Sequence, residues 1–333
     1  MNKKLIIQFA SFCFLLVLTA CKKEIVLPIN DQSKPSAALL QVKELKSSDN
    51  EMEFELDVVV FRDSKNIEDQ LDKDNFYIDT IQHRINFSVT DVDLIKGKDK
   101  QPYQVLMLMD QSGSISGTDR NNYRLQAADI FSRNLGQGGE AMLWSFPNRN
   151  YKYVVKKNME KFTSDSVLLS KHIDSLLGKT GGGTPLYQSQ DSALVFLNKD
   201  QSKTAKFLLT FTDGEDGNRN QAENSIYKAK RDHIALFNVG LKSRAEPMQI
   251  RQANETGGAY LLAKEAQQLI SFFGNLGNLL NKSATYYKTT WKITVSKGNL
   301  PKDYRAPIYL KIKLPYSEEP LEVPFFLENK YDN

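Results

Sequence analysis

The sequence predicts an α/β fold, in which a doubly wound, mostly parallel sheet is inserted in, or flanked by, an antiparallel β-sandwich region. The middle of the chain carries short continuous apolar runs that alternate with segments of helical spacing, a pattern typical of a parallel sheet covered by helices. Both flanks instead carry apolar residues at every second position, which indicates strands with one exposed face. The length of 333 residues fits about two domains at roughly 150 residues each.

The composition excludes several classes of protein. The chain has 44 basic and 40 acidic residues and a net charge of +4, which is too balanced for a dedicated nucleic-acid binder, so no nucleic-acid partner is expected. Two Cys and three His are too few for a disulfide framework and leave too few ligands for a structural zinc site. An aromatic content of 10% is that of an ordinary globular protein.

The first residues have the pattern of a secretion signal. Two lysines precede an apolar run over residues 5–18, which is too short to span a hydrocarbon core of about 30 Å comfortably. The run ends in Leu-Thr-Ala-Cys at residues 18–21, which resembles the lipobox of bacterial lipoproteins. This resemblance implies that residues 1–20 are a signal peptide and that Cys21 receives a lipid. A plain signal peptide with an incidental Cys is the alternative.

A tether is expected after the lipidation site, over residues 21–36, which include Pro28 and Pro35. In the Gram-negative lipoproteins that the signal resembles, an Asp after the lipidated Cys often means retention in the inner membrane. This chain has Lys22, so the resemblance favours a cell-envelope protein of the outer membrane and leaves the leaflet open. No later segment is long and apolar enough to span a bilayer, so attachment to the membrane is expected through the lipid on Cys21.

The flanking regions, residues 37–100 and 284–333, are expected to form antiparallel strands. Their apolar and polar residues alternate, so each strand has one buried and one exposed face. Such sheets pack face to face as sandwiches. Two arrangements remain open, one sandwich completed by both flanks or two separate small β modules. The expected strands cover residues 52–60, 85–89, 291–295, 308–314 and 321–327.

Residues 101–283, between the flanks, are expected to form the α/β domain. The apolar runs at residues 105–109, 207–209 and 234–237 are continuous, which indicates strands covered on both faces. Because strand and helix patterns alternate, these strands should be parallel. The expected helices cover residues 123–135, 167–177, 186–197, 222–231 and 269–280.

Small polar residues follow two of these strands and precede one helix. Residues 110–114 (Asp-Gln-Ser-Gly-Ser) and 212–214 (Thr-Asp-Gly) come directly after apolar runs, and residues 181–185 (Gly-Gly-Gly-Thr-Pro) precede a helix. Ligands of open α/β sheets bind beyond the carboxyl ends of the strands, so these segments should meet at one edge. Each segment alone also fits turn and helix-cap chemistry, but their joint occurrence favours a functional site.

The residue types in these segments suit a hard divalent cation. Mg²⁺ takes six oxygen ligands in a tight octahedron and keeps several waters. The protein therefore needs to supply only a few hydroxyl ligands, together with carboxylates that act through bound water. Neutral hydroxyl ligands leave the cation electrophilic, so one coordination position can accept a carboxylate from another molecule. We expect a divalent cation here, with Mg²⁺ first and Mn²⁺ or Ca²⁺ as alternatives.

These segments resemble the metal-ion-dependent adhesion site of the von Willebrand factor type A domain family. That family has Asp-x-Ser-x-Ser after its first strand, a Thr before a later helix, and an Asp in a Thr-Asp-Gly after the central strand. The resemblance implies that the hydroxyls of Ser112, Ser114 and Thr184 bind the metal directly, whereas Asp110 and Asp213 act largely through water. It extends over the expected α/β domain and not over the flanks.

The sequence as a whole predicts a lipid-anchored, non-catalytic binding or adhesion protein of the cell envelope. Its divalent cation would recruit an exposed Asp or Glu of a protein partner. Two other classes remain as alternatives. One is a structural subunit of an envelope assembly, and the other is a metal-dependent hydrolase, for which Glu215 is the one weak candidate for a general base.

Overall fold

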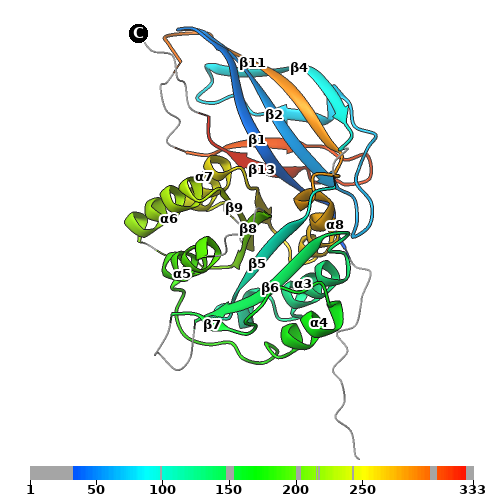
Figure 1. The fold of residues 1–333 in the computed structure, drawn as a ribbon. Coiled ribbons are helices and arrows are strands. Elements are labelled where there is room, and N and C mark those ends of the chain that lie inside the picture. The colour runs from blue at the N-terminus through cyan, green and yellow to red at the C-terminus, as the bar shows by residue number, and fades with distance from the viewer. Residues whose placement is uncertain are drawn as a thin grey trace, which may run out of the picture.

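Strands from both ends and from the middle of the chain assemble into two sheets in the computed structural model (Figure 1). The structure describes residues 33–97, 100–147, 154–199, 204–214, 216, 218–241, 244–300 and 306–327, so Cys21 and Glu215 lie outside the described residues. The strands are β1 (Ser36–Ser47), β2 (Glu51–Phe61), β3 (Phe76–Ile78), β4 (Ile85–Ile95), β5 (Tyr103–Asp110), β6 (Gly139–Phe146), β7 (Lys156–Lys157), β8 (Ala205–Thr212), β9 (Ile234–Leu241), β10 (Tyr260–Ala263), β11 (Tyr286–Val295), β12 (Ile308–Ile312) and β13 (Leu321–Phe325). The helices are η1 (Lys73–Asn75), α2 (Ile115–Thr118), α3 (Tyr123–Arg133), α4 (Ser166–Asp174), α5 (Leu186–Lys199), α6 (Arg219–Arg231), α7 (Pro247–Thr256) and α8 (Gln268–Leu280).

The larger sheet has ten strands within the described residues, in the order β4-β11-β2-β1-β10-β9-β8-β5-β6-β7. The smaller sheet has the order β13-β12-β3. No helix in the described part of the chain is both long and apolar enough to cross a bilayer.

The α/β part contains the parallel strands β10, β9, β8, β5 and β6. Helices α5, α6 and α7 cover one face of these strands, and α3, α4 and α8 cover the other (Figure 1). This explains why the central strands are apolar along nearly their whole length, since both faces are buried. The predicted α/β fold with a mostly parallel sheet, flanked by an antiparallel sheet, is confirmed.

The sequence patterns did not predict helix α7 and strand β10, which lie near one end of the parallel sheet. Helix α7 is polar along most of its length, so its apolar spacing is weak. Its start depends instead on Pro247 at the first turn and on the Glu246 side chain, which accepts a hydrogen bond from the Met248 N–H, and it ends at Gly257 with a φ of 76°. Strand β10 has only 4 residues, which is too short for a periodic pattern.

The antiparallel part is one sandwich to which both flanks contribute. Strand β2 of the N-terminal flank pairs with β11 of the C-terminal flank, and β11 pairs in turn with β4. In the smaller sheet β3 pairs with β12. The two sheets share a core in which the Phe54 ring lies 6.3 Å from Trp291 and 6.2 Å from Phe325. The arrangement with two separate β modules is therefore excluded.

The two parts of the molecule are joined through β1 and α8. Strand β1 pairs with β2 along its length and also reaches β10, where Leu39 is opposite Tyr260. Ser36, the last residue of the expected tether, already belongs to β1, and its hydroxyl lies 2.7 Å from that of Ser271 in α8. The large sheet is thus continuous between the α/β part and the sandwich.

Candidate metal centre

Three loops meet at the carboxyl edge of the parallel strands. The loop after β5 and the glycine loop before α5 are joined by two backbone hydrogen bonds, from Gly181 N to Gln111 O at 2.8 Å and from Gly113 N to Gly182 O at 3.1 Å. Gly181 and Gly182 have φ values of 146° and 92°, which favour glycine because it has no Cβ. The glycine loop can therefore follow the backbone of the loop after β5 closely.

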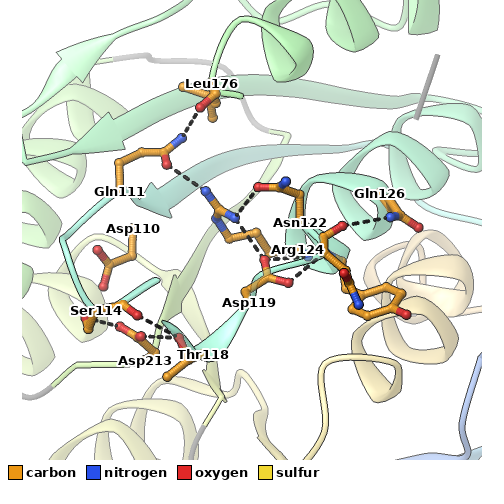
Figure 2. A network of polar contacts seen from close by, with 12 residues as sticks. Asp110, Gln111, Ser114, Thr118, Asp119, Asn122, Arg124, Gln126, Leu176 and Asp213 are labelled. Atoms are coloured by element: carbon orange, nitrogen blue, oxygen red, sulfur yellow. Dashed lines mark hydrogen bonds and ion pairs between the residues drawn. The ribbon is translucent and has the colours of Figure 1, made fainter. Parts of the chain in front are cut away.

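Side-chain oxygens from these loops lie within hydrogen-bond distance of one another. The Ser112 and Ser114 hydroxyls are 3.0 Å apart, and Ser114 donates to Oδ1 of Asp213 at 2.8 Å. The Thr118 hydroxyl donates to the other oxygen of the same carboxylate (Figure 2). Ser112 is buried, whereas Ser114 is exposed, so the cluster opens to solvent on the Ser114 side.

Asp110 lies beneath this cluster at the end of β5 and is fully buried. One carboxylate oxygen accepts a hydrogen bond from the Ser112 N–H at 2.7 Å, and the other accepts from the Thr212 hydroxyl at 2.7 Å. Burial raises the pKa of Asp110 above its ordinary value, the hydrogen bonds from Thr212 and Ser112 oppose this rise, and the charge of Asp213 adds to it. A buried carboxylate next to a second one is a favourable place for a cation.

Thr184 completes the set of predicted residues at this edge. A Cβ placed on Gly214 would lie 2.8 Å from the Thr184 Oγ1, so this hydroxyl lies directly against the loop that carries Asp213. A side chain at position 214 would push Thr184 away, which explains the need for glycine there. The structure therefore brings Asp110, Ser112, Ser114, Thr184 and Asp213 together.

The donor set fits a small divalent cation. In an octahedron with metal–oxygen distances of about 2.0–2.1 Å, neighbouring ligand oxygens lie about 3 Å apart. The separation of 3.0 Å between the Ser112 and Ser114 hydroxyls, two of the expected direct ligands, is close to that value. Within the described residues, no three His, Cys, Asp or Glu side chains are placed to hold a metal ion. Any metal held here would therefore depend on hydroxyl ligands in addition to the two carboxylates.

Several residues that support the site were missed by sequence reasoning. Thr118, which lies outside the motifs, donates to Asp213, and Thr212, which was named only as part of Thr-Asp-Gly, donates to Asp110. Asp216, which the sequence places in a small acidic cluster, accepts hydrogen bonds from the Tyr187 N–H at 3.0 Å and the Asn218 N–H at 3.1 Å. It therefore caps the start of α5, and nothing local in the sequence indicates this contact.

A buried network lies behind the loop after β5 (Figure 2). The Arg124 guanidinium donates to Asp119 at 2.9 Å and to the Gln111 side chain at 2.7 Å. The side chains of Arg124 and Asp119 are 1% and 0% exposed. Both charges are thus removed from water and neutralise each other.

A family model agrees with this arrangement. The model of the von Willebrand factor type A domain matches residues 104–275. This range includes every predicted ligand and runs from the second residue of β5 to the middle of α8. In a search of curated proteins, the chain is 24% identical over 219 residues to calcium-activated chloride channel regulator 1 of Bos taurus. That match covers 63% of this chain and 23% of the bovine protein, so the chain spans less than a quarter of its relative's length.

Solved structures with a similar fold include two proteins named for attachment or matrix roles. One is proximal thread matrix protein 1 from the mussel byssus, solved with zinc in its metal-ion-dependent adhesion site (MIDAS) motif. It has a TM-score of 0.46 and 15% identity, and the match covers 60% of this chain and 49% of that one. The pilus adhesin SpaC from Lactobacillus rhamnosus GG has a TM-score of 0.44 and 11% identity, covering 89% of this chain and 48% of that one. At these identities the likeness concerns the fold alone.

Proposed function

This chain belongs to the von Willebrand factor type A domain family, and from that premise we propose that it is a lipid-anchored binding protein of the cell envelope, which recruits an acidic residue of a protein partner through a divalent cation. The proposal makes it an adhesion-type protein and not an enzyme. It combines a cation site in the α/β part with an anchor at Cys21.

The observation that carries the proposal is the convergence of hydroxyl and carboxylate oxygens at one sheet edge. Ser112, Ser114 and Asp213 form a chain of contacts at 3.0 and 2.8 Å, and Thr184 lies against the same loop. Asp110 supplies a second, buried negative charge beneath them. Such a group of oxygens, open to solvent at Ser114, is what a cation-dependent binding site requires.

The residues divide into two roles. We assign direct ligation to the hydroxyls of Ser112, Ser114 and Thr184, with Asp110 and Asp213 acting largely through water. A divalent cation held by this set would supply an electrophilic coordination position for a carboxylate of another molecule. Mg²⁺ is the ion we favour, with Mn²⁺ and Ca²⁺ as alternatives, because hydroxyl and carboxylate oxygens suit hard cations.

A hydrolase would need a general base close to the metal. The sequence candidate for that role, Glu215, lies outside the described residues. Its neighbour Asp216 is already engaged by the backbone N–H groups of Tyr187 and Asn218. This engagement favours the binding function over the catalytic one.

Cation binding can be tested with one variant and a matched control two residues further along the chain. We expect Ser114→Ala to weaken Mg²⁺ or Mn²⁺ binding by at least the roughly 10–100-fold that loss of a supporting residue costs a metal site, because it removes an expected ligand and a partner of Asp213. Ser116→Ala is the control, since the Ser116 hydroxyl donates to Gly113 O at 2.8 Å and is not an expected ligand. Isothermal titration calorimetry of the full chain measures both. Equal affinities for the two variants would contradict the proposal.

Recruitment of a carboxylate can be tested on the Mn²⁺-loaded chain with two synthetic peptides, Gly-Gly-Asp-Gly-Gly and Gly-Gly-Asn-Gly-Gly, both amidated at the C-terminus so that the Asp side chain is the one carboxylate in the pair. A carboxylate that replaces metal-bound water lowers the relaxation enhancement of water protons, and the neutral amide should not do so. We expect the Asp peptide alone to lower the enhancement, and the effect should disappear with EDTA. Identical responses to both peptides would mean that the site does not select acidic partners.

The anchor is tested independently of the cation site. Expressed in a Gram-negative host, the chain should incorporate labelled palmitate, and Cys21→Ser should abolish the label. Cys13→Ser, within the expected signal peptide, should leave the label unchanged. A label that survives Cys21→Ser would remove the lipid anchor from the proposal and leave the cation site untouched. Fractionation of the labelled chain between inner and outer membrane tests the expected location.

A further inference from the structure

A buried guanidinium lies behind the loop of residues 110–114, which we call the metal loop. It belongs to Arg124 in the first turn of α3. A cation at this place is unfavourable for the helix, because the N-terminus of a helix carries a partial positive charge, and burial also removes the hydration of the ion. Within the described residues, the Arg124 Nε has no hydrogen-bond partner. Local helix stability therefore does not explain Arg124.

The two terminal nitrogens of Arg124 face different parts of the structure (Figure 2). Nη1 donates to Asp119 at 2.9 Å and to the Asn122 side chain at 3.2 Å, both of which lie just before α3. Nη2 donates to the Gln111 Oε1 at 2.7 Å. Asp119 also accepts a hydrogen bond from the backbone N–H of Tyr123 at 2.7 Å. The same carboxylate therefore both neutralises the guanidinium and caps the helix. The guanidinium thus links the start of α3 to the metal loop.

Gln111 is the residue between the two expected metal-site residues Asp110 and Ser112. Its side-chain amide accepts from Arg124 and donates to the Leu176 carbonyl, 3.3 Å away, just after α4. Its backbone carbonyl accepts from Gly181 N in the glycine loop at 2.8 Å. Gln111 is therefore fixed on three sides, and its position determines where its two neighbours in the chain lie.

We propose that Arg124 is a positioning residue of the metal centre, which acts through Gln111 to hold Asp110 and Ser112 in place. The inference rests on the proposed function, since it concerns the same cation site. A planar guanidinium suits this task because its nitrogens lie in a rigid fork and can bind Asp119 and Gln111 at once, whereas a lysine ammonium is a point charge on a flexible chain. Residues that orient metal ligands from behind typically change metal affinity about 10–100-fold when they are altered.

Two buried glutamines of the chain provide a matched pair of variants. Gln111→Met removes the link between Arg124 and the metal loop and keeps the approximate volume of the side chain. Gln126→Met is the control, because Gln126 lies in α3, is also buried, and donates to Asn121 O at 3.0 Å without contacting the loop. Both substitutions remove one buried amide, but Gln111→Met also leaves Nη2 of Arg124 without its partner, so it should cost more stability than Gln126→Met in the absence of cation.

The measurements on the full chain are Mn²⁺ affinity by calorimetry, the electron paramagnetic resonance spectrum at saturating Mn²⁺, and thermal unfolding in EDTA. We expect Gln111→Met to lower the affinity about 10–100-fold and to change the zero-field splitting of the bound ion. Gln126→Met should bind Mn²⁺ as the unaltered chain does. Arg124→Lys should resemble Gln111→Met, with Arg133→Lys as its control, since Arg133 pairs with Asp129 at 2.9 Å in the same helix.

The possible outcomes separate this inference from the proposed function. If the unaltered chain binds no divalent cation, the proposed function fails, and the inference fails with it. If the unaltered chain binds Mn²⁺ and Gln111→Met matches Gln126→Met in affinity and spectrum, only the positioning role of Arg124 is overturned. A loss of affinity with an unchanged spectrum would show that Gln111→Met destabilises the fold without moving the metal ligands, and it would also overturn the positioning role.

Discussion

Polar side chains gather at strand ends in the α/β part of the molecule, whereas in the antiparallel sandwich they are spread along the exposed faces of strands. Asp110 ends β5 and Thr212 ends β8, and their side chains meet at 2.7 Å. In the sandwich, charged residues form cross-strand pairs such as Lys292 with Glu51 at 3.1 Å and Lys43 with Glu55 at 3.5 Å. The same large sheet contains both arrangements.

Strand direction explains the difference. Parallel strands place all their carboxyl ends at one edge, so loops far apart in the chain converge there. Antiparallel neighbours alternate in direction, so the carboxyl ends of the strands are divided between the two edges of the sheet and fewer of them gather in one place. The comparison indicates that a site built from several loops forms at the parallel end of the sheet, while the sandwich contributes packing. Three predictions test this division, in order of decreasing effect.

The largest expected effect is on stability and comes from the sandwich core. Trp291 is 1% exposed, stacks on Phe54 and donates through its indole N–H to the Thr289 hydroxyl at 2.7 Å. We expect Trp291→Ala to lower the free energy of unfolding by about 3–5 kcal/mol, because it leaves a large cavity. The Mn²⁺ affinity of the folded molecules should not change. Chemical denaturation and calorimetry measure the two quantities. A parallel loss of affinity would show that the sandwich and the metal centre are energetically coupled.

A smaller effect is expected where the two parts meet at α8. A Cβ on Gly274 would lie 2.2 Å from the Ser64 carbonyl oxygen of the segment after β2. Gly274→Ala should therefore destabilise the chain by about 1–3 kcal/mol, since this clash outweighs the gain in helix propensity of at most about 1 kcal/mol. Gly117→Ala in α2 is the control, because nothing lies within 4 Å of the added methyl group there. Equal unfolding midpoints for both variants would mean that α8 and the sandwich can separate at little cost.

The smallest effect concerns a carboxylate on the face of the sandwich. Desolvation by partial burial raises the pKa of Asp57, with Lys288 opposing this rise, and one of its oxygens has no partner among the described residues. Because the folded chain then binds the proton more tightly than the unfolded chain, Asp57 lowers stability as the pH rises above its unfolded pKa. Asp57→Asn should be more stable at pH 7 by less than about 1 kcal/mol, since the side chain is only partly buried and is screened.

The difference between Asp57→Asn and the unaltered chain should vanish near pH 3, where the carboxyl group is protonated in both states. Urea unfolding at pH 3 and pH 7 measures it. If Asp57→Asn is instead less stable than the unaltered chain at pH 7 and not at pH 3, the sign is reversed. Lys288, which lies opposite Asp57 on the neighbouring strand, then outweighs desolvation.

Local patterns predicted several elements that have a regular period and a long enough run, although β6, with its continuous apolar run, was not among the predicted strands. The alternation over residues 52–60 predicts β2, and the continuous run at 105–109 predicts β5, because burial on one or two faces repeats with every strand residue. Helices α3 and α5 start where they are expected, at Tyr123 and Leu186. The short β10 and the polar α7 could not be found this way, since neither has a periodic apolar face of sufficient length.

The sequence by itself determined the class of fold and the order of its parts, because these follow from the periodicity of neighbouring residues. The five oxygen-bearing residues of the candidate site were predicted from the resemblance of three short segments to a family motif. Only the tertiary structure decided that strands from both flanks share one sandwich, that β1 joins it to the parallel strands, and that Arg124 contacts Gln111 of the metal loop from behind. Such contacts join residues far apart in the chain or on separate elements. They depend on how whole elements pack, and this packing produces no periodic pattern in the residues around each contact.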